Sequence, residues 1–270
     1  MRSNNPMSND EIQRYAPSAF AGQPYSKQSD RYTFVPTSDV IDGMRSAGFQ
    51  PVMAGQSRSR IEGKAMFTKH MIRFRSQDQT LTAVGDSVLE TVLVNSHDGT
   101  SAYRLSMGVF RLVCSNGLVV ADALVQSVAI RHVGNITERV IESTREMLTN
   151  APTVADAINR WRQIQLSQAE QLFLAESAHA LRFEDNNNLA VAIPAQKLLA
   201  PRRYNDNGTD LWSTFNRVQE NTVRGGVRGF DAQRGTRVRS REVKGIDQST
   251  TLNRQLWTLA EKMAELKGQQ

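Results

Sequence analysis

Residues 88–120, VLETVLVNSHDGTSAYRLSMGVFRLVCSNGLVV, decide the fold because they hold three β-forming runs separated by two turn signals. The runs are Val88–Val94, Tyr103–Val113 and Leu118–Ala121. The turns are Asn95-Ser96-His97-Asp98-Gly99 and Ser115-Asn116-Gly117. Asp-Gly and Asn-Gly supply the positive φ angles that tight turns need, so these runs predict neighbouring antiparallel strands.

Similar runs extend this sheet in both directions. We expect further strands at residues 31–35, 49–53, 65–75 and 125–132, and a helix after Pro36 with Val40, Ile41 and Met44 on one face. Gly48 is a natural end for that helix. The sheet is therefore predicted to span about residues 32–132.

After Gly134 the apolar spacing changes to a helical period. Helices are expected over 136–148, from Thr153, from the capping box that begins at Ser167, over 191–200, over 210–223 and over 247–267. The glycine- and arginine-rich segment 224–244 is expected to be a loop. The predicted class is α+β, a twisted antiparallel sheet packed on helices with a helical C-terminal part. The predicted divisions are a flexible arm at 1–30, a sheet-plus-helix core at 31–183 and a helical region at 184–270.

Composition narrows the class of protein. The chain has 270 residues, 39% hydrophobic residues and a formal net charge of +6. The single cysteine, Cys114, excludes an internal disulfide, and one cysteine with four scattered histidines gives no zinc spacing. We expect no metal, no cofactor, no membrane span and a cytoplasmic location.

The positive charge is concentrated in two segments. Residues 51–75 hold six basic residues against one acidic residue, and residues 222–245 hold seven against two. Arginine forks bind two phosphate oxygens at once, and glycine allows the backbone to approach a nucleic-acid strand closely. The alternative is a solvated loop whose arginines pair with nearby carboxylates. The predicted nucleic-acid contacts, including a tyrosine that could stack on a base, are Arg58, Arg60, Lys64, Lys69, Arg73, Arg75, Tyr103, Arg104, Arg234, Arg237, Arg239 and Arg241.

No enzyme motif is convincing, so we expect the protein not to be an enzyme. The pair His97-Asp98 is explained by turn chemistry, and His132 at a strand end is expected to be structural. Cys114 is expected to be a buried small hydrophobic residue. The glycines at 225–229 lack the Lys-Ser/Thr ending of a nucleotide-binding loop.

Several blocks resemble a family of unknown function that phages, plasmids and genomic islands carry. The resemblance covers about residues 32–264. It is carried by the 95–99 turn, residues 110–118, Arg131-His132, Asn216–Asn221, Arg241–Asp247, Asn253-Arg254 and Trp257. It implies a family identity and no catalytic residues.

The order of elements also resembles phage single-strand annealing proteins. An aromatic segment at 32–35 is followed by a short helix and the step Gly48-Phe49 before the sheet. This resemblance implies sequence-tolerant binding of single-stranded DNA, strand annealing in recombination or replication, and assembly into a ring or filament. Two alternatives stay open. One is an interaction protein that modulates host defence or replication through a protein partner, and the other is a hydrolase that uses His97, Asp98 and His132.

Overall fold

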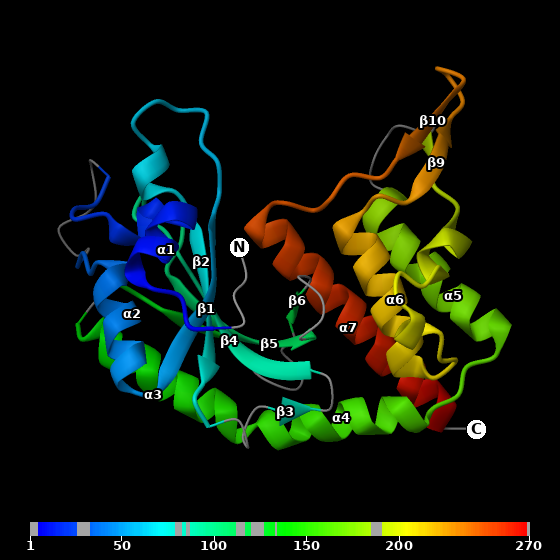
Figure 1. Cartoon of the computed structure of the whole chain (residues 1–270), viewed down its shortest axis with the longest axis horizontal. Coiled ribbons are helices and arrows are strands. Elements are labelled where there is room, and N and C mark those ends of the chain that lie inside the picture. The colour runs from blue at the N-terminus through cyan, green and yellow to red at the C-terminus, as the bar shows by residue number, and fades with distance from the viewer. Residues whose placement is uncertain are drawn as a thin grey trace. The chain divides into compact units, whose positions relative to one another are not determined.

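The chain is an α+β protein, as predicted, and it divides into two compact units, residues 1–152 and 153–270. The computed structural model describes residues 5–25, 33–78, 83–84, 87–111, 117–119, 127–132, 134–184 and 191–268. Figure 1 shows the sheet with α2 and α3 in the first unit, and α5, α6 and α7 in the second. The sequence prediction placed a boundary after residue 183, whereas the two compact units divide after residue 152, so most of α4 and all of α5 belong to the second unit.

An antiparallel sheet organises the first unit. Its central order is β1, β2, β4, β5, with β3 paired to β4 and with β6 and β7 paired to β5. The register places Ile72 opposite Leu93, and Val92 opposite Ser106. The strands are β1 (Phe49–Gln56), β2 (His70–Ser76), β3 (Ala83–Val84), β4 (Ser87–Asn95), β5 (Tyr103–Arg111), β6 (Gly117–Val119) and β7 (Val128–Ile130).

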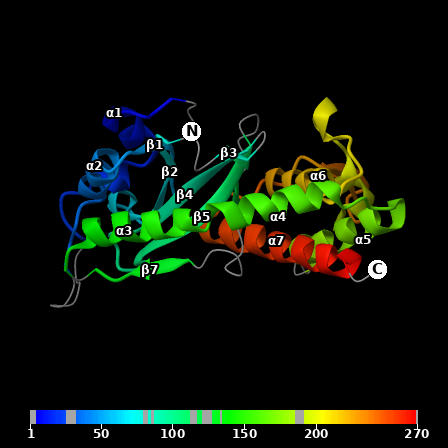
Figure 2. The same ribbon diagram turned by 90° about the horizontal axis from the view of Figure 1, so that it is seen from below.

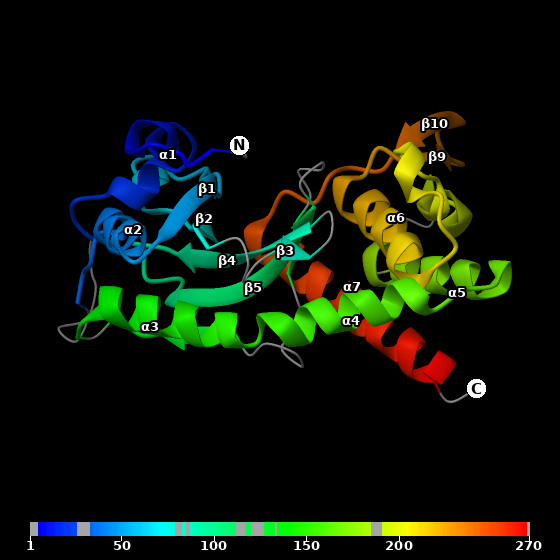
Figure 3. The ribbon, with the colours of Figure 1, turned by 60° about the horizontal axis from the view of Figure 1, so that its bottom comes forward.

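Two helices pack on one face of this sheet, α2 (Thr37–Ser46) and α3 (Ile136–Thr149). Figures 2 and 3 show α3 running along the strands of the sheet. The two helices approach closely at Gly43, where an added Cβ would lie 2.4 Å from Cγ2 of Thr137. Alternation along β2 directs Ile72 and Phe74, both buried, toward the same side as His70, which contacts α2.

The N-terminal segment differs from the predicted flexible arm. Residues 5–25 include α1 (Asn9–Tyr15) and the short 3₁₀ helix η1 (Pro17–Phe20). Ser8 and Glu11 form a capping box at the start of α1, and Ile12 is fully buried. The backbone N–H of Met7 donates to the carbonyl of Pro51 at 2.7 Å, which ties this segment to β1.

The second unit has an aromatic core. The ring centroids of Trp161 and Trp257 lie 4.6 Å apart. Trp212 and Phe215 both pack on Trp161, and Phe215 also packs on Trp257. These residues come from α4, α6 and α7, so the helices meet at one cluster. The elements are α4 (Ala151–Gln163), α5 (Gln168–His179), the π turn η4 (Ala180–Glu184), the 3₁₀ helices η5 (Ala195–Leu199) and η6 (Tyr204–Asp206), α6 (Leu211–Arg224) and α7 (Ile246–Gly268).

The segment predicted to be a loop contains a β-hairpin. Strands β9 (Arg228–Asp231) and β10 (Thr236–Arg239) pair with each other, and β8 (Val191–Ala192) adds a third strand on β9. The expected helix at 191–200 is therefore replaced by β8 and η5. The arginine- and glycine-rich composition favoured a loop in the sequence prediction, although the side chains of both strands alternate between two faces.

Three expected strands also differ in extent. Residues 33–35 form no strand, and residues 31–32 lie outside the described residues. The expected strand 65–75 begins only at His70, because residues 65–67 form the 3₁₀ helix η2 (Ala65–Phe67). The expected strand 125–132 is limited to β7 within the described residues. Cys114, Ser115 and Asn116 lie outside the described residues, and of the strand expected at 118–121 only residues 118–119 are described, in β6.

Candidate nucleic-acid interface

The β9–β10 hairpin gathers basic and aromatic side chains on one face. Residues directly opposite each other in an antiparallel pair share a face, and so do residues two apart. Arg237 lies opposite Phe230, and Arg239 lies opposite Arg228. These four residues, which we call the Arg–Phe face, are all exposed, and Phe230 keeps 49% of its surface accessible.

The turn of the hairpin is built by one aspartate and one glycine. The buried Asp231 accepts hydrogen bonds through Oδ1 from the backbone N–H groups of Gln233 and Arg234, both at 3.0 Å. Gly235 has a φ of +62°, a conformation that favours glycine. The carboxylate of Asp231 also lies 3.8 Å from Nε of Arg234. Arg234, which was predicted to contact nucleic acid, is therefore part of the turn.

The base of the hairpin is fixed to the end of α6. Gly226 donates its N–H to the carbonyl of Ser240 at 2.7 Å, and Ser240 donates its own N–H to Val227 at 2.9 Å. Gly225 has a φ of +67°, and a Cβ there would lie 2.5 Å from the carbonyl oxygen of Arg241. The hairpin therefore leaves the helix in a direction that only glycine at this position permits.

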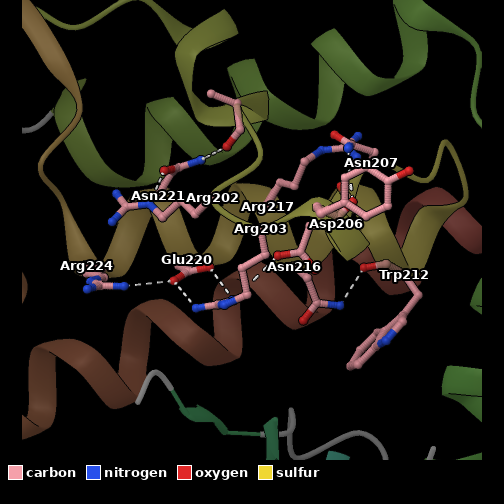
Figure 4. A network of polar contacts seen from close by, with 12 residues as sticks. Arg202, Arg203, Asp206, Asn207, Trp212, Asn216, Arg217, Glu220, Asn221 and Arg224 are labelled. Atoms are coloured by element: carbon pink, nitrogen blue, oxygen red, sulfur yellow. Dashed lines mark hydrogen bonds and ion pairs between the residues drawn. The ribbon is translucent and has the colours of Figure 1, made fainter. Parts of the chain in front are cut away.

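A polar network on α6 stabilises the segment beside this base (Figure 4). Glu220 accepts two hydrogen bonds from Arg203, at 2.9 and 2.7 Å, and a third from Arg224 at 3.2 Å. Asn221 accepts from Nε of Arg202 at 2.7 Å, and Arg202 also donates to the carbonyl of Gly225. Burial lowers the pKa of Arg202, the largest cause being loss of solvent. These arginines serve the architecture that positions the hairpin.

Arg217, which precedes Glu220 on α6, also has a structural role. Its guanidinium donates to the carbonyls of Asp206 and Gly208, at 2.5 and 2.7 Å, and to the side chain of Gln171 at 3.0 Å. The block 216–221 that carries the sequence resemblance is thus largely a scaffold. Its buried polar side chains hold loops and helices together in the second unit.

Two predicted phosphate contacts in the first unit are wrong. Arg73 is only 2% exposed, bonds Glu90 at 2.7 Å through Nε, and lies 3.3 Å from the ring centre of Phe110. Arg75 bonds the other oxygen of the same carboxylate at 3.0 and 2.6 Å. The single buried carboxylate of Glu90, on the neighbouring strand β4, pairs with both guanidinium groups and holds them inside the protein, which the sequence pattern did not reveal.

Tyr103 is also not available for base stacking. Its ring is fully buried, and its hydroxyl donates to the carbonyl of Val35 at 2.9 Å. Lys64 pairs with Asp98 at 3.1 Å. Of the other predicted contacts in the first unit, Arg58, Arg60 and Arg104 are exposed and Lys69 is half-buried.

Among the residues that the structure describes, exposed basic side chains without a carboxylate partner lie on the hairpin, on the loop between β1 and β2 and on several helices. Arg237, Arg239 and Arg241 were predicted from charge, whereas Arg228 and Phe230 were not selected as contacts. The period-two alternation in Arg228-Gly229-Phe230 and Arg237-Val238-Arg239 is the signal that could have found them. The arginines of the two basic segments that are exposed and form no ion pair with the described residues are Arg58, Arg60, Arg228, Arg237, Arg239 and Arg241.

Histidines in the first unit form a buried cluster around Thr37. The Oγ1 atom of Thr37 lies 2.9 Å from Nε2 of His70, 3.2 Å from Nε2 of His97 and 3.1 Å from Nδ2 of Asn95. Asn95 in turn contacts His132 at 3.1 Å. Burial lowers the pKa of His70 to about 3 and that of His97 to about 4, so both rings are neutral at pH 7.

Asp98 forms its hydrogen bonds and ion pair outside this cluster. It accepts the N–H and the hydroxyl of Thr100, at 3.1 and 2.5 Å, and pairs with Lys64. Burial acts to raise the pKa of Asp98, but these hydrogen bonds lower it further than burial raises it. The charge of Asp98 acts to raise the pKa of His97, but burial lowers it further, and the rings of His70 and His97 are wholly enclosed.

Within the described ranges, no three histidine, cysteine or acidic side chains are grouped so that they could hold a metal ion. Nor does any helix in the described part of the chain have the length and apolar character needed to cross a membrane.

The fold and the site define an α+β protein with an exposed arginine hairpin. The chain belongs to the DUF932 family, a domain of unknown function, whose model matches residues 24–257. It is 38% identical over 261 residues to UPF0380 protein YafZ of Escherichia coli K12, and 37% identical over 261 residues to UPF0380 protein YfjQ of the same strain. Each alignment covers 97% of this chain and 93% of the relative. No solved structure is significantly similar to the chain.

Proposed function

We propose that this protein binds single-stranded DNA without strong sequence preference and promotes strand annealing. The activity would serve recombination or replication of a phage or plasmid in the cytoplasm, with the protein assembled as a homo-oligomer. The Arg–Phe face carries the proposal, because it combines three exposed guanidinium groups with one exposed aromatic ring.

This chemistry favours a single strand over a duplex. Proteins that hold single strands combine cationic side chains along the backbone with aromatic rings that stack on unpaired bases. In a duplex the faces of the bases are already stacked on one another. Phe230 can stack only on a base whose face is accessible, while Arg228, Arg237 and Arg239 bind the phosphates beside it.

Charge on a sheet edge also has a protective use. β10 is the last strand of its sheet, and charged side chains on edge strands prevent pairing with other chains. That role accounts for arginines on β10. It does not account for Phe230, which lies on β9 and exposes an apolar ring on the same face.

The test is fluorescence anisotropy of a labelled thirty-nucleotide oligo(dT) over a salt series, with wild type and the double variant R237A/R239A. Each phosphate contact to a single strand contributes about 0.7 to the slope of log K against log salt, so the double variant should lower the slope by about 1.4. The matched control is R145A/R160A, which removes two exposed arginines from helices. It should leave the slope unchanged within about 0.3.

Two outcomes would remove the proposal. One is the absence of binding at low salt, and the other is an equal slope for both double variants. If wild type binds no oligonucleotide and captures an acidic protein partner after nuclease treatment, the interaction-protein alternative replaces it. Annealing is measured separately, as the rate at which two complementary labelled strands pair with and without the protein.

A further inference from the structure

The loop between β1 and β2, residues 57–69, extends beyond the ends of its two strands (Figure 1). Its base is closed by the N–H of Ser57, which donates to the carbonyl of Lys69 at 2.7 Å. The hydroxyl of Thr68 donates to the carbonyl of Ser57 at 3.0 Å. We call this segment the β1–β2 loop.

The turn at 95–100 braces this loop from the side. The N–H of His97 donates to the carbonyl of Phe67 at 3.0 Å, and Asp98 pairs with Lys64 at 3.1 Å. The ring of Phe67 also lies 5.3 Å from that of Tyr25. A loop fixed at this many points loses little conformational freedom when it binds a partner.

The β1–β2 loop exposes aliphatic side chains beside free positive charges. Ile61 is 59% exposed and Met66 is 44% exposed. Arg58 and Arg60 precede Ile61, are exposed, and make no ion pair with the described residues. The Oγ atom of Ser59 accepts the N–H of Ile61 at 3.0 Å, which fixes the turn that presents the isoleucine.

We infer that the β1–β2 loop is a second nucleic-acid contact, specific for duplex DNA, in which Ile61 enters between two base pairs. Proteins that kink duplexes insert isoleucine, leucine or methionine at a base step while arginines bind nearby. An aliphatic side chain has no ring to stack on a free base, so it gains most where it can enter an existing stack. Arg58 and Arg60 provide the positive charge that phosphates on either side require.

This inference uses different residues from the single-strand proposal, so the two can fail independently. The experiment uses the full chain and a hairpin duplex that contains 2-aminopurine, a base whose fluorescence rises when it is unstacked. At saturating protein we expect wild type to raise the fluorescence at least about twofold. I61A should remove most of that rise, and I61L should restore it.

Three further variants separate the causes. R58A/R60A should weaken duplex binding while leaving the fluorescence at saturation close to that of wild type. L266A removes an exposed leucine from α7 and should behave as wild type. R237A/R239A should weaken single-strand binding and keep the 2-aminopurine signal.

The inference is overturned if wild type does not bind the duplex, if it binds without increasing the fluorescence, or if I61A matches wild type. Ile61 is exposed, so circular dichroism should show I61A to be folded. A partner protein that needs Ile61, combined with unchanged 2-aminopurine fluorescence, would assign the loop to protein binding.

Discussion

Lowering the pH from 7 to 5 should destabilise the first unit by about 4 kcal/mol, because its buried histidines must stay neutral. An unfolded histidine has a pKa near 6.5, whereas burial lowers the folded pKa of His70 to about 3 and that of His97 to about 4. Below pH 6.5 the unfolded chain therefore binds more protons than the folded chain. The stability is fully present above pH 6.5 and is lost as the pH falls toward the folded values.

The magnitude follows from the width of that window. Each pH unit below 6.5 costs about 1.4 kcal/mol per histidine, so a fall to pH 5 costs about 2 kcal/mol for each ring. The acidic groups with lowered pKa, including Asp98 and Glu11, protonate at lower pH and contribute little at pH 5. The slope between pH 6.5 and 5 therefore belongs mainly to the histidines.

Hydrogen–deuterium exchange is the suitable assay, because the two units must be followed separately. All three tryptophans, Trp161, Trp212 and Trp257, lie in the second unit, so their fluorescence does not report on the first. Peptides from β4 should lose about 4 kcal/mol of protection between pH 7 and 5 after correction for intrinsic exchange. H97Q keeps an N–H that can reach Thr37 and should reduce the slope by the share of one histidine, because burial also lowers the pKa of His70 and of His132.

A protection free energy for β4 that is flat between pH 7 and 5 would refute this reasoning. So would a slope in H97Q equal to that of wild type. Either result would mean that the rings take up protons in the folded state without cost, for example because the cluster is more open to water than its burial indicates.

Three other predictions follow from single contacts. F230A should weaken oligo(dT) binding about 5- to 150-fold, the range for loss of one stacked base, while F230W should bind nearly as wild type; equal binding by F230A would contradict the stacking role. E90Q should destabilise the first unit by about 3 kcal/mol, because it leaves the guanidinium groups of Arg73 and Arg75 without the carboxylate that they share. The measurement is urea unfolding followed by hydrogen exchange in β4. A loss below about 1 kcal/mol would show that the two arginines keep a partner of similar strength. G225A should loosen the base of the β9–β10 hairpin, because its Cβ would clash with the carbonyl of Arg241, and trypsin should then cut the hairpin faster. An unchanged cleavage rate would show that the hairpin base can adjust.

Periodicity predicted the main sheet and most helices well. The Asp98-Gly99 turn, the β4 and β5 strands on either side of it, and the Ser167 capping box are all where local chemistry placed them. These signals lie within a few residues of the structures that they specify. The N-terminal helix was missed because its single buried isoleucine, Ile12, gives no repeating apolar pattern over seven residues.

The fate of individual arginines could not be predicted from charge density. Arg73 and Arg75 belong to a basic segment of the sequence, yet both pair with Glu90, 17 and 15 positions away on the neighbouring strand. Arg202 and Arg203 lie outside the two predicted segments and are held by α6. Partners distant in sequence decide whether a cation is structural or exposed, and only the register of strands and helices reveals them.

In the β9–β10 hairpin, the alternation of side chains along each strand predicts which arginines are exposed better than the net charge does. A net count treats residues 222–245 as one positive segment, but alternation divides its two strands into two unlike faces. One face holds Gly229, the buried Asp231 and Val238, while the other holds only arginines and Phe230 across β9 and β10. Because the first face is partly buried, a general solubility role would also place charge on the second face, but it would not require an aromatic ring among the charges. The exposed ring of Phe230 therefore favours a surface that binds a polyanion containing flat bases, and the F230A measurement tests that step directly.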